Sequence, residues 1–182
     1  MKNIVTLAAW LVIAAIVLTS QAAQTAIKGV EAAKNELTAS IERMEKLLED
    51  TNRSLEELDV IYQLSEEYQV PPEVILAVMK VESNFSPTAK NGRCYGIMQI
   101  SDMHSEGFDV TTEELLDLRR NTEVGTSLLS GLMSSSESLT EALGKYNMGE
   151  RGYRNYCERV GKKTTQYTQK ALEIVSGLKK EE

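Results

Sequence analysis

The apolar positions of the chain fall into three successive patterns. A continuous apolar run extends from Ile4 to Leu18, apolar side chains then recur every three or four residues between positions 27 and 62, and shorter helical blocks follow. The first pattern is typical of an export segment, the second of an amphipathic or coiled-coil helix, and the third of a compact helical domain. We therefore expect three regions, at residues 1–27, 28–53 and 54–182.

The first region carries Lys2 and then no charge until Lys28. Its apolar run, followed by small residues near Ala22, matches a cleavable signal peptide. The uncharged stretch is also long enough to span a bilayer as an anchor. The sequence leaves both alternatives open, and in either case we expect export, with a membrane contact if the segment is not cleaved.

The second region has a heptad-like seam. Eleven positions between 27 and 62 alternate steps of three and four residues, and nine of them are apolar, with Lys34 and Thr51 as the exceptions. This spacing predicts either a coiled coil, through which chains could self-associate over residues 28–53, or an amphipathic helix packed on the neighbouring domain.

The third region predicts an all-α domain. Ser54 and Glu57 form a capping-box pattern that marks a helix start, and Pro71-Pro72 separates that helix from the next. Aromatic residues make up 5% of the chain, which has 11 Gly and 3 Pro, so a sandwich of many short strands is disfavoured. The expected helices are 54–68, 72–83, 112–118, 121–133, 137–146 and 165–178.

Charge limits the partners. The formal net charge is −7 and the pI is about 5.0. Affinity for nucleic acid comes from neutralising phosphates with Lys and Arg, so nucleic acid is not expected as a partner. Residues 145–170 nevertheless hold seven basic against two acidic side chains, so an anionic ligand should meet the C-terminal part.

The helix expected at 72–83 places a carboxylate in an apolar stripe. On a helical wheel Glu82 lies in line with Val74 and Val78. Burying an ionised carboxylate is costly, so the group either finds a partner or its pKa rises, and a carboxyl that keeps its proton can act as a general acid. The alternative is a solvated residue in the last turn of the helix.

Further segments carry amides and phenols suited to binding sugars. The chain has ESNFSPTA at residues 82–89, GIMQI at 96–100, YNMG at 146–149 and a tyrosine at 167. In order and spacing these segments resemble the four motifs of the soluble lytic transglycosylase family, and the likeness runs from about residue 55 to 176. The resemblance implies a lysozyme-like fold, all-α with little or no strand, and no cofactor.

The resemblance also implies a role for each matching residue. Glu82 would be the sole catalytic acid and base in cleaving the bond between N-acetylmuramic acid and N-acetylglucosamine of peptidoglycan glycan strands, leaving a 1,6-anhydro end without consuming water. Such an enzyme would act in the cell envelope. We expect Tyr146 or Tyr167 to hydrogen-bond Glu82. The residues expected to support the acid or to line the substrate site are Ser83, Gly96, Met98, Gln99, Tyr146, Asn147 and Tyr167.

Two features depart from the family pattern, and both are expected to lie at the substrate groove. The loop KNGRCY at 90–95 is compact, and Lys145 stands where the family often has a small residue. Cys94 and Cys157 each lie a few residues from a motif. A disulfide that joins the two loops is one alternative, and two free thiols are the other.

Two rival functions have their own sequence requirements. A hydrolytic muramidase needs a second carboxylate, for which Asp102 is the candidate, although a turn or cap role is the alternative. A non-catalytic envelope scaffold would grip glycan without needing Glu82. His104 is the only histidine, and because one histidine cannot assemble a metal site, no metal is expected.

Overall fold

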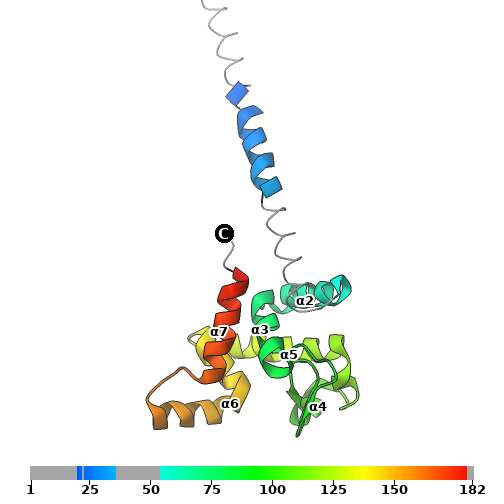
Figure 1. The fold of residues 1–182 in the computed structure, drawn as a ribbon, viewed down its shortest axis with the longest axis vertical. Coiled ribbons are helices and arrows are strands. Elements are labelled where there is room, and N and C mark those ends of the chain that lie inside the picture. Colours follow the sequence, from blue (N-terminus) through cyan, green and yellow to red (C-terminus); the bar gives the residue numbers. More distant parts are fainter. Residues whose placement is uncertain (1–19, 22, 36–53, 180–182) are drawn as a thin grey trace, which may run out of the picture. The chain divides into compact units, whose positions relative to one another are not determined.

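The structure, a computed structural model, describes residues 20–21, 23–35 and 54–179 of the chain (Figure 1). The chain divides into two units, Met1–Lys46 and Leu47–Glu182. All the motif residues belong to the second unit.

In the first unit the described residues are helical, and their side chains are exposed. Ile27 is 57% exposed and Val30 is 70% exposed. None of the helices in the described ranges is both long and apolar enough to cross a bilayer. The signal peptide or anchor expected at 1–27 and the rod expected at 28–53 fall largely outside the described residues, so both stay predictions.

Over residues 54–179 the second unit is mainly helical, as predicted, and its strand content is limited to one small sheet. The sheet is antiparallel in the order β1-β2-β3, with Lys90 opposite Tyr95 and Cys94 opposite Ser101. The strands are β1 (Lys90–Asn91), β2 (Cys94–Tyr95) and β3 (Ile100–Ser101), the α-helices are α2 (Leu55–Tyr68), α3 (Pro72–Ser83), α4 (Ser105–Phe108), α5 (Leu118–Ser134), α6 (Leu139–Val160) and α7 (Gln166–Lys179), and the 3₁₀ segments are η1 (Asp102–His104) and η2 (Glu114–Leu116).

Helix α2 begins at the capping box that the sequence predicts. The Glu57 N–H donates to Ser54 Oγ at 3.2 Å, and the Ser54 N–H donates to the Glu57 carboxylate at 2.9 Å. These bonds satisfy two N–H groups that no helical carbonyl can reach. The buried Leu58, Ile61 and Leu64 lie on this helix, which packs against α5.

Helix α3 supplies the centre of the core. Its residues 74–79 are all buried, and it packs against both α7 and α2, beside which it lies in Figure 1. Each large apolar side chain buried in this way contributes about 1.5–3 kcal/mol. The apolar run therefore holds α3, and with it the position of Glu82 in the last turn, rigidly within the domain.

Two expected helices have the wrong bounds. The one expected at 112–118 is reduced to η2, because Asp117 instead caps α5 by accepting the Arg120 N–H at 2.8 Å. The one expected at 137–146 is the first part of α6, which continues to Val160. Gly149, at φ 71° and ψ 160°, kinks α6, and only the glycine backbone adopts such a conformation without strain.

Candidate active site

The last turn of α3 carries the carboxylate that the sequence singled out. Glu82 and Ser83 end the helix, and the next two residues, Asn84 and Phe85, both have left-handed backbone, with φ values of 52° and 63°. Phe85 is only 6% exposed, and its N–H donates to the Met79 carbonyl at 3.2 Å. The buried ring offsets the backbone strain and fixes the direction in which the chain leaves the helix.

Glu82 is partly buried beside a phenol. The Tyr167 hydroxyl donates to Glu82 Oε1 at 2.8 Å. Burial raises the pKa of Glu82 above its ordinary 4.5, and the hydrogen bond from Tyr167 opposes this rise without cancelling it. None of the ion pairs found in residues 54–179 involves Glu82. The carboxyl is therefore favoured to keep its proton to a higher pH than an exposed one.

The second tyrosine of the site is bound differently. The Tyr146 hydroxyl donates to the Met98 carbonyl at 2.9 Å. Burial and then the nearby Glu82 carboxylate raise the pKa of Tyr146, and the same causes in the same order raise that of Tyr167. Both phenols are neutral hydrogen-bond donors at physiological pH. Of the two tyrosines expected to bond Glu82, Tyr167 is the one that does so.

Ser83 ties the end of α3 to the segment after β2. Its hydroxyl donates to the Ile97 carbonyl at 2.7 Å and accepts the Ser86 N–H at 3.0 Å. These bonds hold the residue next to Glu82 from two sides. The supporting role that the family resemblance implies for Ser83 stays a prediction.

The GIMQI segment uses its side chains mainly to pack and to bond its own loop. Met98 is 0% exposed, and a Cβ on Gly125 of α5 would meet its sulfur, so that side chain faces the core. The Gln99 amide donates to the carbonyls of Gly96 at 2.9 Å and Ala89 at 3.2 Å. Both the side chain and the backbone of Met98 are therefore buried, and of the residues in this segment only Gln99 is partly exposed. Asn147 is exposed.

The two cysteines are not bridged. Cys94 and Cys157 are both free and partly buried. Burial and the nearby Glu82 and Asp102 carboxylates raise the pKa of the Cys94 thiol, whereas Cys157 lines a pocket on α6 with Tyr153. Of the two alternatives left open by the sequence, the structure has the free thiols, because the two motifs bring different neighbours to each cysteine.

Asp102, the candidate second carboxylate, is already paired. The Arg93 Nε donates to its two oxygens at 2.8 and 3.0 Å, and Arg93 Nη2 lies 2.8 Å from Oδ1. The Asp102 N–H also donates to the Arg93 carbonyl at 2.9 Å. Asp102 thus joins the two strands of the β2–β3 hairpin at their open end, opposite the turn, and begins η1, so it has a structural role of the kind that the sequence offered as its alternative.

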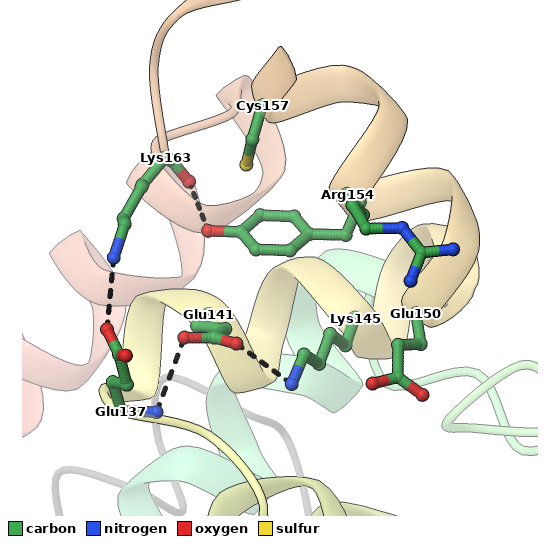
Figure 2. Close-up of a pocket in the computed structure, with 8 residues that line it drawn as sticks. Glu137, Glu141, Lys145, Glu150, Arg154, Cys157 and Lys163 are labelled. Carbon is green, nitrogen blue, oxygen red and sulfur yellow. Dashed lines mark hydrogen bonds and ion pairs between the residues drawn. The ribbon is translucent and has the colours of Figure 1, made fainter.

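Lys145 does not lie with Glu82, contrary to the expectation that it sits at the substrate groove. It is 8% exposed, and its ammonium lies 2.9 Å from the Glu141 carboxylate and 3.3 Å from the Ser135 carbonyl. It lines a pocket of about 270 Å³, whose lining residues are drawn in Figure 2. Glu82, Tyr146 and Tyr167 are not among the residues that line this pocket. One step along a helix turns the side chain by 100°, so Lys145 and Tyr146 face different sides of α6.

The ion pairs of this second pocket are satisfied within the protein. Lys163 lies 3.2 Å from Glu137, and the Tyr153 hydroxyl donates to the Lys163 carbonyl at 2.7 Å (Figure 2). The remaining charged lining residues, Glu150 and Arg154, are exposed. The contacts around this pocket therefore hold the loop before α7 against α6 and the residues that precede α6.

Asn121 belongs to the site and was not singled out from the sequence. It is 0% exposed, and its side-chain amide bonds Met98, Tyr95 and Leu115, each at 2.8 Å. The available signal was its place in the buried stripe of α5, three and four residues before Val124 and Gly125, where a polar residue needs partners.

A helical domain with a half-buried glutamic acid at a helix end, next to a small antiparallel hairpin, has the architecture of lysozyme-like domains that cleave glycans. The sequence profile described as transglycosylase SLT domain matches residues 59–169, more than half of the chain. The chain therefore belongs to this family of lytic transglycosylases, whose substrate is peptidoglycan, and its lysozyme-like all-α fold is confirmed. No curated protein matches the chain.

Proposed function

We propose that this protein cleaves the glycosidic bond between N-acetylmuramic acid and N-acetylglucosamine in peptidoglycan and leaves 1,6-anhydro ends, with Glu82 as the single acid and base. The observation that carries the proposal is one partly buried carboxyl with a raised pKa and a neutral phenol as its donor. The only other carboxylate suggested by the sequence, Asp102, is held by Arg93.

The first step uses Glu82 in its protonated form. Tyr167 binds Oε1, and the proton is then carried by Oε2. Transfer of this proton to the glycosidic oxygen lets the bond between that oxygen and C1 of the muramyl sugar break, and the leaving sugar departs as an alcohol. The Glu82 carboxylate formed at this point keeps the hydrogen bond from Tyr167, which stabilises the new negative charge.

The second step returns the proton. The Glu82 carboxylate removes the proton of the C6 hydroxyl of the muramyl sugar, and that oxygen forms a bond to C1. Glu82 is protonated again and no water is consumed. Because the nucleophile belongs to the substrate, this chemistry needs no second carboxylate, in contrast to glycoside hydrolysis with its pair of acids.

The decisive experiment is product analysis. Purified peptidoglycan is digested with the full chain and the fragments are weighed, with the Glu82→Gln variant as comparison. Anhydro ends, lighter by one water than reducing ends, support the proposal, and reducing ends indicate hydrolysis. No fragments from either protein would favour the glycan-binding scaffold, and cleavage by Glu82→Gln at the wild-type rate would reject Glu82 as the acid.

The same substrate implies a place of action. Peptidoglycan lies outside the cytoplasmic membrane, and the uncharged segment before Lys28 supports export to the envelope, as a cleaved or an anchored form. Self-association through residues 28–53 would bring two catalytic domains to one wall. N-terminal sequencing and sedimentation of the exported protein test these two points separately.

A further inference from the structure

One peptide unit beside the site is held at both of its ends. The Ile97 carbonyl accepts the Ser83 hydroxyl at 2.7 Å, and the Met98 N–H of the same peptide unit donates to Asn121 Oδ1 at 2.8 Å. Hydrogen bonds arranged in series through one amide polarise each other. Ser83, the neighbour of Glu82, is therefore connected to Asn121 of α5 through a single rigid group.

Asn121 has little freedom to move. Its amide nitrogen donates to the carbonyls of Tyr95 and Leu115, both at 2.8 Å, and the residue is fully buried. Gly96 makes this possible, because a Cβ at that position would lie 2.2 Å from Asn121 Nδ2. The Asn121 side chain thus joins the end of β2, the segment η2 before α5, and the peptide unit that accepts the Ser83 hydroxyl.

Met98 connects the same amide to the tyrosine of the site. Its N–H is bonded to Asn121, and its own carbonyl accepts the hydroxyl of Tyr146. Any displacement of Met98 therefore shifts the positions of two hydroxyl groups. It moves that of Ser83 through the shared peptide unit and that of Tyr146 through the Met98 carbonyl. Ser83 is the chain neighbour of Glu82, and Tyr146 lies close enough to it that burial first and the Glu82 charge next raise the pKa of Tyr146.

We propose that Asn121 is a positioning residue for the reaction: it fixes the peptide unit between Ile97 and Met98 and through it the groups around Glu82. This inference rests on the proposed function for its kinetic consequences. Asn121 makes no bond to Glu82, so it acts through Ser83 and Tyr146 and is not a catalytic residue. A role limited to stability would lower the folded fraction without changing the chemistry of the folded enzyme.

The main variant is Asn121→Ala, which leaves space for water to reach the freed backbone groups. Its matched control is Thr122→Val on the same helix, because Thr122 is also 0% exposed but its hydroxyl bonds only Leu118 of its own helix, at 2.7 Å. We expect Asn121→Ala to lower kcat by about 30-fold or more with KM within about 3-fold, per folded molecule, and Thr122→Val to leave both within about 2-fold.

A double-mutant cycle tests the route. Asn121 and Ser83 hold the same peptide unit, so we expect Asn121→Ala to lower kcat far less in a Ser83→Ala background than in the wild type. Strictly additive losses, or a folded Asn121→Ala variant with the kcat of Thr122→Val, would overturn the proposal.

Two further measurements cover the remaining cases. If Asn121→Ala does not fold, Asn121→Asp at about pH 5 replaces it. This variant keeps the acceptor for the Met98 N–H, because a carboxyl buried between two carbonyls stays protonated, and its kcat should exceed that of Ser83→Ala.

If the wild type makes no anhydro ends, the proposed function fails, but NMR titration of the ligand-free chain still tests the positioning. The pKa of Glu82 should fall toward 4.5 in the folded Asn121 variant and stay unchanged in Thr122→Val; an unchanged value in both would contradict the proposal.

Discussion

The hydroxyl of Tyr167 lies 2.8 Å from Oε1 of Glu82, although the two residues are 85 positions apart in the sequence. Helices α3 and α7, which carry them, pack against each other. Burial raises the pKa of this carboxyl, and the Tyr167 hydroxyl is a neutral hydrogen-bond donor to it. It therefore opposes burial, and the balance between the two sets the pH range in which Glu82 can donate a proton.

Removing that donor should slow the reaction and shift its pH profile. In Tyr167→Phe the carboxylate formed after the first proton transfer loses a charge-assisted hydrogen bond, and we expect kcat to fall about 10-fold or more. The pKa of Glu82 should rise further, so the limb on which activity declines with Glu82 ionisation moves to higher pH. The measurement is kcat against pH.

The matched control is Tyr156→Phe, which removes a bond from a phenol to the Thr164 carbonyl at 3.0 Å, on α6. This variant should keep the wild-type profile. A limb that moves to lower pH in Tyr167→Phe would contradict our account of how the two residues interact.

Glu82 should also make the stability of the fold depend on pH. Its pKa is raised in the folded state, so the stability associated with its proton is present below about pH 4.5 and is lost as the pH rises through the folded-state pKa. The Glu82→Gln variant does not lose stability in this way, because its side-chain amide does not ionise. We expect the Tm of Glu82→Gln minus that of the wild type to increase from pH 4 to pH 8, measured by thermal unfolding of both proteins. A difference that shrinks over this range would show that the folded protein prefers the ionised group.

The sequence was sufficient for most of the helices and for the central carboxylate. The apolar run of α3 has one clear period, so the pattern placed Glu82 in the buried stripe and offered a raised pKa, with a solvated residue in the last turn as the alternative. The structure has the raised pKa. Ser54 with Glu57 likewise marked the start of α2. In both cases the feature is determined by residues within one or two helical turns of each other, so the local sequence pattern was enough to predict it.

Other features depend on contacts that no local pattern contains. Each strand is two residues long, too short for an alternation of polar and apolar side chains to be recognised. The second half of α6, from Gly149 to Val160, is mostly polar because much of it faces solvent, so its helical period carries no apolar signal. The choice between Tyr146 and Tyr167 and the role of Asn121 depend on how α6 packs against α5 and α7, and on how α7 packs against α3.

Gly96 should tolerate no side chain. At φ +76° its backbone suits glycine, and a Cβ would lie 2.2 Å from both Asn121 Nδ2 and the Leu115 carbonyl oxygen. We expect Gly96→Ala to reduce the free energy of unfolding by about 3 kcal/mol or more and to abolish cleavage. The matched control is Gly92→Ala, at φ +60° with open space around the new carbon, which should cost about 1 kcal/mol. Urea unfolding of both variants measures the difference, and equal losses would contradict the predicted clash.

Asp102 should be dispensable for the chemistry. Its carboxylate pairs with Arg93, whose side chain is 77% exposed, and such surface pairs contribute about 0–1 kcal/mol. We expect Asp102→Asn to keep kcat within about 3-fold of the wild type, to form the same anhydro ends, and to change stability little. Mass analysis of the fragments checks this result. A loss comparable to that of Glu82→Gln, or a change from one type of end to the other, would restore the hydrolytic muramidase with two carboxylates.

Thr126 carries a buried hydroxyl with no hydrogen-bond partner. It is 0% exposed on α5, so its hydroxyl loses water on folding and gains no bond in return. Valine has nearly the same shape, and we expect Thr126→Val to raise the free energy of unfolding by about 1 kcal/mol without affecting cleavage. Thr168→Val is the matched control, because that equally buried hydroxyl accepts the Thr165 N–H at 2.9 Å and donates to the Thr165 carbonyl at 3.0 Å. The control should lose about 1–2 kcal/mol in the same urea experiment. If both variants lose stability alike, the hydroxyl of Thr126 has a hydrogen-bond partner in solution. That partner would be a water molecule buried beside α5 at this position.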